Sequence, residues 1–410
     1  MLDFTDPPVH VPARGCARRI ILYSHDTLGF GHLRRNLLIA TALKARLAQA
    51  EILMIGGMRE AGAFEFPKGV DCITLPAYAK GSDGTYAPRD LGGDLAALTE
   101  LRAKMIKATV KAFAPDLMII DNVPRGALFE LDQTLAMLKA RGKTRIVLGL
   151  RDVIDTPSEV RKQWIRQRNF ETVRKFYDAV CVYGDPAFYD LLEDCGLDKG
   201  IGVPAQHMGY LDHSTRLSSA VADRDRDAVL AGDTSPYVLC AVGGGRDGAA
   251  LCEAFARAPL PEGHRGILVT GTQMPDQLRT QLHDAIAGRD DITLVPFVRE
   301  PIALMAGAAR IVSMGGYNTT CEILLLRRTA LIVPRAEPRQ EQLIRTRHLA
   351  ARGLVSMLHP DDLTPDAIGQ WLRAEPLNDR SRTPDMNGLS RFCMLMADML
   401  APERELARAS

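Results

Sequence analysis

Short apolar runs alternate with longer amphipathic stretches along most of the chain. The stretches at 33–47 and 95–113 place their apolar residues at helical spacing. Runs that are apolar throughout are typical of strands buried on both faces, and their alternation with helices predicts a parallel sheet covered by helices. The strands expected in this first series are 20–24, 51–55, 117–121, 145–150 and 179–183.

The same rhythm restarts after about residue 215, which predicts a second sheet. At 410 residues the chain exceeds what one hydrophobic core usually supports, so two doubly wound, Rossmann-like domains with a cleft between them are expected. The segment 211–234 is polar and is interpreted as a linker with an irregular entry to the second domain. The second series has expected strands 237–242, 266–270, 292–295, 310–313 and 330–333, and expected helices 248–258, 276–288, 319–325 and 340–351.

Composition excludes several classes of protein. The net charge of +1 argues against a protein built to hold nucleic acid. The cysteines are scattered, with no Cys-x-x-Cys and no zinc spacing, so a reduced, cytoplasmic compartment is expected. No apolar run reaches the roughly 18 residues that span a bilayer, and the N-terminus lacks the apolar core of a signal peptide.

A glycine-containing loop follows the first expected strand. Gly29 and Gly31 at a strand-to-helix turn let the backbone approach a ligand. The dinucleotide pattern fails, because its third glycine would fall at Arg34 and the second strand ends in two glycines instead of an acid. His32 at this turn is a candidate general base, and the alternative is that it only caps or packs the loop.

The second domain opens with another glycine turn. Gly243, Gly244 and Gly245 follow an apolar strand and could accept an anion, to which Arg246 would add a positive charge. The alternative is a plain tight turn.

The stretch after the strand at 310–313 is the most informative. Gly315 and Gly316 make a turn into an expected helix, whose free amides would face an anion. Glu322 is expected in the first turn, where it could reach ribose hydroxyls. The alternative is a capped structural helix. The side chains expected to supply the N-cap are Asn318, Thr319 and Thr320.

A fourth loop, 333–342, follows the strand at 330–333. It holds the carboxylates of Glu337 and Glu341 and the amide of Gln342, which could satisfy sugar hydroxyls. A polar loop that starts a solvated helix is the alternative.

Three other patterns are set aside. The end of a P-loop is mimicked at 142–144, without the first glycine or a preceding strand. The Asp-x-Asp at 223–225 has no strand to present it and reads as a solvated charge cluster. The basic segment 161–174 reads as a solvated helix face, with contact to anionic lipid or an acceptor phosphate as the alternative.

Together, the glycine turns that open both domains, Ser-Met-Gly-Gly-Tyr-Asn-Thr-Thr-Cys-Glu at 313–322 and Pro-x6-Glu-Gln at 334–342 resemble glycosyltransferase family 28. That family has the GT-B fold and includes the N-acetylglucosaminyltransferase that forms lipid II. The resemblance spans roughly 18–400 in architecture and is specific over 292–353. It implies an acceptor-side domain at 18–212, a nucleotide-sugar-binding domain at 213–385 and a C-terminal helix at 386–410 that crosses back, after a loose tail at 1–17.

The resemblance also implies roles for residues. The loop of Gly29 and Gly31 faces the acceptor and the donor diphosphate, and the base is His32 or, because this loop is longer here, His25. The diphosphate turn matches Gly315, Gly316, Asn318, Thr319 and Thr320, with the turn of Gly243, Gly244, Gly245 and Arg246 nearby. Phe297 and Val298 match the segment that reads the nucleobase, Glu322 the acid on the ribose, and Glu337, Glu341 and Gln342 the donor-sugar contacts.

The resemblance implies an inverting, metal-independent glycosyltransferase without a cofactor. Its substrates would be a nucleoside-diphosphate sugar, with a UDP-sugar favoured, and a saccharide or lipid-linked acceptor, in cell-envelope or polysaccharide synthesis. Peripheral contact with the inner face of the membrane fits the lysines of 95–111, although a helix covering the sheet explains them as well. The rival hypotheses are a sugar-nucleotide epimerase or hydrolase on the same fold and a non-catalytic nucleotide-sugar-binding protein.

Overall fold

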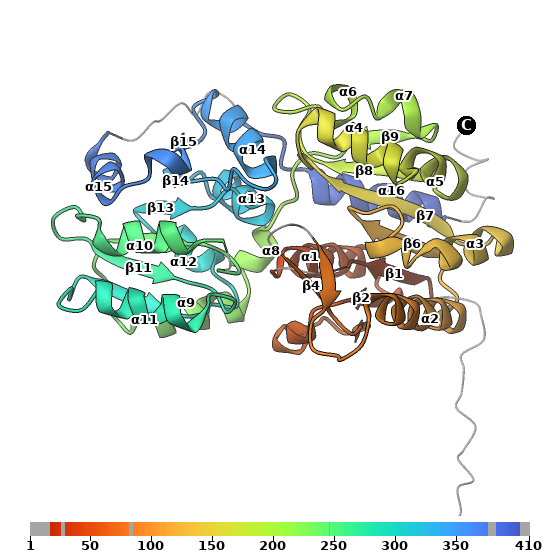
Figure 1. Cartoon of the computed structure of the whole chain (residues 1–410), viewed down its shortest axis with the longest axis horizontal. Coiled ribbons are helices and arrows are strands. Elements are labelled where there is room, and N and C mark those ends of the chain that lie inside the picture. Colours follow the sequence, from red (N-terminus) through yellow and green to blue (C-terminus); the bar gives the residue numbers. More distant parts are fainter. Residues whose placement is uncertain (1–16, 26–28, 82–84, 246, 376–382, 402–410) are drawn as a thin grey trace, which may run out of the picture.

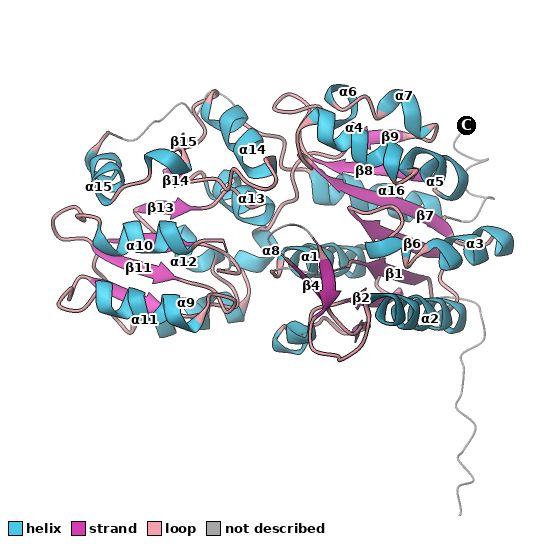
Figure 2. Cartoon of the chain, in the orientation of Figure 1, coloured by secondary structure: helices cyan, strands magenta, loops and turns pink. Residues whose placement is uncertain are grey.

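The computed structural model describes residues 17–25, 29–81, 85–245, 247–375 and 383–401. Within them the chain forms two parallel sheets, each flanked by helices (Figure 1; Figure 2). We call the described residues up to 212 the first half and those from 213 to 375 the second half. In Figure 1 the first half runs from red to yellow and the second half from green to blue. The predicted α/β class with two doubly wound sheets is confirmed.

The first half contains a seven-stranded parallel sheet in the order β3-β2-β1-β6-β7-β8-β9. Its central strands are almost entirely apolar, and β6 and β8 are buried along their whole length, as a sheet covered on both faces requires. The two outer strands, β3 and β9, were not predicted, because their polar residues hide the pattern. The strands are β1 (Arg19–Tyr23), β2 (Glu51–Gly56), β3 (Val70–Thr74), β6 (Leu117–Asp121), β7 (Arg145–Arg151), β8 (Ala179–Tyr183) and β9 (Ala205–His207).

Helices and a small hairpin complete the first half. Asp94 caps α2, since its side chain accepts from the amide of Ala97 at 2.6 Å, and Thr156 caps α4 in the same way. The elements are α1 (Gly31–Arg46), η1 (Arg59–Ala63), the hairpin of β4 (Tyr78–Lys80) and β5 (Tyr86–Pro88), α2 (Leu95–Phe113), η2 (Ala127–Phe129), α3 (Asp132–Arg141), α4 (Pro157–Arg166), α5 (Asn169–Phe176), α6 (Leu191–Asp194) and α7 (Asp198–Ile201).

The second half contains a six-stranded parallel sheet in the order β12-β11-β10-β13-β14-β15. The five predicted strands are present within one residue at each end. The strands are β10 (Tyr237–Ala241), β11 (Arg265–Val269), β12 (Ile292–Val295), β13 (Arg310–Ser313), β14 (Ala330–Ile332) and β15 (Ser356–Met357). The helices are α10 (Ala249–Arg257), α11 (Asp276–Ala285), α12 (Ile302–Gly307), α13 (Tyr317–Leu326), α14 (Glu341–Ala350), η3 (Pro360–Asp362) and α15 (Pro365–Arg373).

The segment expected to be an irregular linker is largely helical, so that expectation was wrong. It contains α8 (Ser214–Leu217) and α9 (Ala220–Leu230). Ser219 starts α9 by accepting from the amide of Ala222 at 3.1 Å, and the first turn buries Val221. The Asp-x-Asp pattern at 223–225 lies on this helix.

The last helix, α16 (Gly388–Leu400), packs against the first half, beside α1 (Figure 1). Phe392 is fully buried, and its ring centroid lies 5.3 Å from that of Tyr183 at the end of β8. Before α16, the chain runs beside the segment that leaves β9. There the amide of Tyr210 donates to the carbonyl of Asp385 at 2.7 Å, and the amide of Gly388 donates to the carbonyl of Tyr210 at 3.0 Å. The boundaries assigned to the two domains stay predictions.

The buried ring of Phe392 provides a test of how α16 is anchored. Phe392→Ala removes a ring that is 0% exposed, so we expect the free energy of unfolding to fall by about 3–5 kcal/mol. Urea unfolding followed by circular dichroism measures this loss. Met394→Ala, on the exposed side of the same helix, is the control and should change stability little. Equal effects of the two substitutions would contradict the packing of α16.

Candidate functional site

The strand order of each sheet changes direction at one place. In the first sheet this place lies between β1 and β6, and in the second between β10 and β13. Ligands of open α/β sheets bind outside the carboxyl ends of the strands at such switch points. The loops after these four strands line one cleft of about 1340 Å³ between the two halves. The loops that the sequence predicts to bind a ligand therefore line this cleft.

Most of the predicted site residues line this cleft. Gly315, Thr320 and Glu337 do not contribute to its wall, and Arg246 lies outside the described residues. The residues that line it are His25, Gly29, Gly31, His32, Gly243, Gly244, Gly245, Phe297, Val298, Gly316, Asn318, Thr319, Glu322, Glu341 and Gln342.

The N-terminus of α13 opens into the cleft. Gly316 is its N-cap, and no side chain caps the helix, which corrects the expectation that residues 318–320 do so. The first helical bond runs from the amide of Thr320 to the carbonyl of Gly316 at 2.9 Å. The amides of Tyr317, Asn318 and Thr319 donate to no described residue. Together with the helix dipole, they form a site that favours an anion.

The two glycines before α13 serve different purposes. A Cβ on Gly315 would lie 2.7 Å from the hydroxyl oxygen of Thr346, so this residue lets the turn pack against α14. A Cβ on Gly316 would meet nothing within 4 Å, so this residue leaves open space at the helix start. Thr320 is buried behind them, and within the described part of the chain its hydroxyl has no partner.

The turn of Gly243, Gly244 and Gly245 lies against the first half. Gly243 and Gly245 have positive φ angles of 69° and 92°. A Cβ on Gly245 would also lie 2.1 Å from the carbonyl oxygen of Thr270, so only glycine fits there. A Cβ on Gly244 would lie 3.3 Å from the Cα of Gly29, which places the two glycine loops face to face across the cleft.

His32 forms a dyad with Asp121. The sequence predicts His32 as a candidate base but does not predict Asp121 as its partner. The two are joined by a 2.5 Å contact between Nδ1 of His32 and Oδ2 of Asp121 at the end of β6. The guanidinium of Arg35 also holds Asp121, with Nη2 at 2.5 Å from Oδ2 and Nε at 3.1 Å from Oδ1. Because Nδ1 faces the carboxylate, Nε2 is the ring nitrogen that remains for a substrate.

The charges around this dyad fix the protonation of Asp121. Burial raises the pKa of Asp121, but Arg35 and His32 outweigh burial and hold that pKa well below its usual range. The carboxylate is therefore ionised and accepts the Nδ1 proton of His32. His25 lies with its ring centroid 4.8 Å from that of His32, and burial lowers its pKa well below the usual value.

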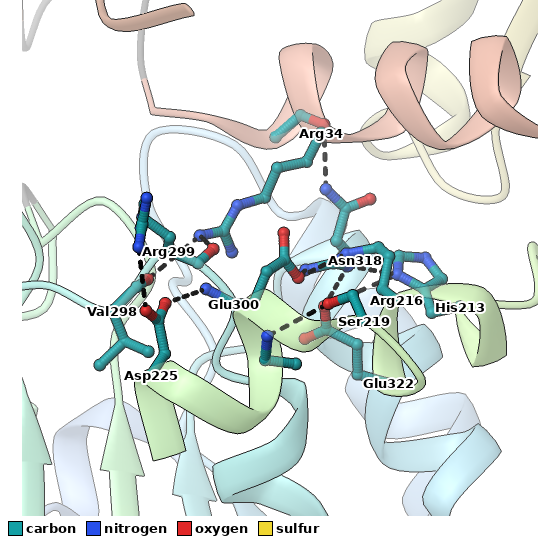
Figure 3. A network of polar contacts seen from close by, with 12 residues as sticks. Arg34, His213, Arg216, Ser219, Asp225, Val298, Arg299, Glu300, Asn318 and Glu322 are labelled. Atoms are coloured by element: carbon teal, nitrogen blue, oxygen red, sulfur yellow. Dashed lines mark hydrogen bonds and ion pairs between the residues drawn. The ribbon is translucent and has the colours of Figure 1, made fainter. Parts of the chain in front are cut away.

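Glu322 sits in a buried network of charges (Figure 3). It lies in the second turn of α13, not the first as expected, and is 2% exposed. Nη1 of Arg216 lies 2.6 Å from its carboxylate, and Nη2 of Arg216 lies 2.7 Å from Glu300. Burial raises the pKa of Glu322, but Arg216, His213 and Arg34 lower it to about 2. Glu322 still lines the cleft, and its role toward a ribose stays a prediction.

Side chains from the first half reach the segment expected to read a nucleobase. Nη2 of Arg34 in α1 donates to the carbonyl of Arg299 at 2.7 Å and that of Val298 at 3.4 Å (Figure 3). The Phe297 ring contacts Phe30, with centroids 5.7 Å apart. Nearby, the Asn318 side-chain amide donates to the carbonyl of Gly31 at 2.9 Å. These contacts hold the two halves together around the cleft.

The loop expected to contact the donor sugar is arranged around Arg335. Its guanidinium pairs with Glu341 and, at 2.7 Å, with Asp247, while its amide donates to the Gln342 side chain at 3.1 Å. Glu341 is buried at the cleft wall. Glu337 is exposed and lies away from this wall, so the structure does not bring it together with Glu341 and Gln342.

Within the described residues, no group of three or more His, Cys, Asp or Glu side chains is arranged to hold a metal ion. Every helix in that part of the chain is too short or too polar to cross a membrane.

Part of the chain is similar in sequence to curated sugar-transferring enzymes. It is 29% identical over 206 residues to a UDP-N-acetylglucosamine–N-acetylmuramyl-(pentapeptide) pyrophosphoryl-undecaprenol N-acetylglucosamine transferase of Paraburkholderia phymatum, covering 46% of this chain and 54% of that protein. The transferase of the same name from Burkholderia ambifaria is 31% identical over 170 residues, covering 40% and 46%. The chain thus spans about half the length of these curated relatives. No family model matches it.

Solved structures match over nearly the whole chain. A glycotransferase of kitacinnamycin has a TM-score of 0.58 at 13% identity, covering 94% of this chain and all of that one. MurG of Acinetobacter baumannii has a TM-score of 0.53 at 14% identity, covering 93% and 99%. A Listeria monocytogenes protein named for UDP-N-acetylglucosamine 2-epimerase has a TM-score of 0.62 at 10% identity, covering 95% and 99%. The predicted GT-B fold and the resemblance to glycosyltransferase family 28 are confirmed.

The low pKa of Glu322 provides a test by pH. The unfolded carboxyl takes up a proton near pH 4.5, but the folded one only near pH 2, so the ionised form stabilises the fold above about pH 4.5. We expect Glu322→Gln to lower the free energy of unfolding at pH 7 by about 3 kcal/mol. The difference from wild type should shrink at pH 3.5, as urea unfolding at pH 7, 5 and 3.5 would show.

The exposed Glu253 is a suitable control, since it forms a surface ion pair with Arg257 one helical turn away. Glu253→Gln should change stability by less than about 1 kcal/mol at each pH. A Glu322→Gln effect that is the same at all three pH values would contradict an ionised Glu322.

Proposed function

We propose that this chain, a GT-B protein that resembles glycosyltransferase family 28, is an inverting, metal-independent glycosyltransferase. It moves a hexose or N-acetylhexosamine from a nucleoside-diphosphate sugar to a hydroxyl acceptor, in cell-envelope or polysaccharide synthesis. One arrangement carries the proposal. The amides at the start of α13 and the His32–Asp121 dyad line the same cleft, and the Asn318–Gly31 hydrogen bond joins the two helix starts.

The donor diphosphate is assigned to the start of α13. Its amides and helix dipole meet negative charge without needing a side chain, and the turn of 243–245 lies beside them. The curated relatives carry UDP-N-acetylglucosamine in their names, which favours a UDP-sugar. Glu322 would bind the ribose, the backbone of 297–298 the base, and Glu341 and Gln342 the sugar.

The reaction follows from these positions. Nε2 of His32 takes the proton of the acceptor hydroxyl while the hydroxyl oxygen forms a bond to the anomeric carbon. The bond from that carbon to the diphosphate oxygen breaks on the opposite side, so the configuration inverts. Asp121 stabilises the histidine as its charge grows, and the α13 amides stabilise the leaving diphosphate. His32 is favoured over His25 as the base because only His32 is held by a carboxylate among the described residues.

The acceptor is the less defined substrate. The curated relatives are named for transfer to a lipid-linked acceptor, pyrophosphoryl-undecaprenol, which favours a saccharide on a lipid carrier. Such an acceptor would bring the protein to the inner face of the membrane as a peripheral protein. The proposal includes no nucleic-acid partner. The cleft wall at the first half, with Phe129 and Ile165 partly exposed, offers an apolar surface for it.

A sugar-nucleotide epimerase is the second candidate, because the protein named for a 2-epimerase has a TM-score of 0.62. Mass spectrometry of the products, with and without candidate acceptors, distinguishes the two. Transfer requires a glycosylated acceptor, whereas an epimerase converts the donor alone.

Substitution of His32 tests the catalytic assignment. His32→Ala removes the base, so we expect kcat to fall by about 10²–10⁴-fold with donor affinity nearly unchanged. Steady-state kinetics and calorimetric titration with the donor provide the two values. Asp121→Asn should also lower kcat, because the ring loses the carboxylate that orients it. Lost donor affinity with unchanged kcat in His32→Ala would refute the assignment.

Substitution of Gly316 tests the diphosphate site. A panel of nucleoside diphosphates and their sugars, screened by thermal shift, first identifies the nucleotide, with UDP expected to stabilise the wild type. Gly316→Ala places a methyl in open space at a helix start with an ordinary φ of −64°, so the fold should be unaffected. Affinity for the nucleoside diphosphate should fall on the order of ten-fold.

Gly62→Ala is the matched control. This glycine also has open space around its Cβ position but lies outside the cleft wall, so nucleotide affinity should not change. If no nucleoside diphosphate or its sugar stabilises the wild type, the proposed function is wrong.

A further inference from the structure

Arg151 is a cation in the cleft that the proposed reaction leaves without a role. It is the last residue of β7, and its side chain lines the cleft. Its guanidinium forms no hydrogen bond or ion pair with any described residue, and its Nε is buried without a partner. A guanidinium has five N–H donors, and buried donors are normally satisfied.

The acids near Arg151 are already held by other cations. Asp152, the next residue, is bound by Arg345 of α14, with Nη2 at 2.6 Å from Oδ1 and Nε at 2.8 Å from Oδ2. Oε1 of Glu341 pairs with Arg335, whereas its Oε2 is buried and has no hydrogen-bond partner among the described residues. Asp121 is shared by Arg35 and His32 in the dyad described above. Among the described residues, no carboxylate therefore pairs directly with Arg151.

Arg151 is partly buried, and a cation with little access to water and no partner is costly to the fold. Removing such a charge from water costs several kcal/mol unless an opposite charge compensates. Burial, with Arg35 and Arg345, lowers the pKa of Arg151 to about 10, although the charge of Glu341 acts to raise it. The group still carries its charge at neutral pH. An anion that enters the cleft would supply the missing partner.

We propose that Arg151 binds an anionic group, a carboxylate or a phosphate, on one of the two sugars that react in this cleft. The substrate is then an acidic saccharide or a sugar phosphate. The inference rests on the proposed function and extends it to the chemical class of the substrate. Arg151 comes from the first half, and Glu341 and Gln342 line the opposite wall, so the anion belongs to the donor sugar or to the acceptor. The donor diphosphate has its own site at the start of α13.

Calorimetric titration of the whole chain tests this inference. The variant is Arg151→Gln, and the control is Arg145→Gln at the other end of the same strand, where the side chain is 54% exposed. For the donor, UDP, UDP-glucose and UDP-glucuronate are compared, because the two sugars differ only in one carboxylate. For the acceptor, glucose, glucuronate and glucose 6-phosphate are titrated into protein saturated with UDP.

An acidic donor and an acidic acceptor give different results. If the donor carries the anion, wild type prefers UDP-glucuronate to UDP-glucose by about ten-fold or more, and Arg151→Gln loses that preference. If the acceptor carries it, wild type prefers glucuronate or glucose 6-phosphate to glucose, and Arg151→Gln again loses the preference. In both cases Arg151→Gln keeps the wild-type affinity for UDP, and Arg145→Gln keeps the wild-type affinity for every probe.

Three outcomes would overturn the inference. Wild type that binds UDP but prefers no acidic probe would leave the proposed function standing and remove this extension of it. A loss of affinity for UDP itself in Arg151→Gln would assign Arg151 to the donor diphosphate. A lower unfolding temperature of ligand-free Arg151→Gln would make Arg151 a structural partner of Glu341, since removal of an unpaired, partly buried charge should leave that temperature unchanged or raise it.

Discussion

The buried ion pair between Arg345 and Asp152 is the contact on which the geometry of the cleft depends. Both side chains are 1% exposed, and they come from different halves of the molecule. The same guanidinium donates to the carbonyl of Gly315 at 2.8 Å, so one side chain fixes both the end of β7 and the turn before α13. A buried pair of this kind adds little net stability, but it is costly to break. Its effect is to fix the position of the two cleft walls relative to each other.

The two halves contribute different chemistry to this cleft. The second half offers backbone amides, which are positive without a titratable group and so keep their character at any pH. The first half offers side chains whose charge depends on neighbours, such as His32 beside Asp121. A division of this kind suits a reaction in which one substrate leaves as an anion while the other loses a proton.

Local features of the sequence predicted most of the fold and part of the site. Strands such as β6 and β13 are recognisable because burial on both faces leaves their central residues apolar. The pattern predicts neither the outer strand β9 nor the helix α9, because exposed elements carry few apolar residues. The glycine turns follow from local backbone geometry. The partners of His32 and Arg345 do not, because Asp121 and Asp152 become neighbours of these distant residues only when strands pair and the halves meet.

The chain passes between the halves twice, and the two passages are hydrogen-bonded to each other at Tyr210 and Asp385. Two separate connections at distant points would restrain the halves in every direction. Two adjacent ones restrain them at one place only, so the contacts across the cleft, such as that of Arg345 with Asp152, have to fix the separation of the halves elsewhere.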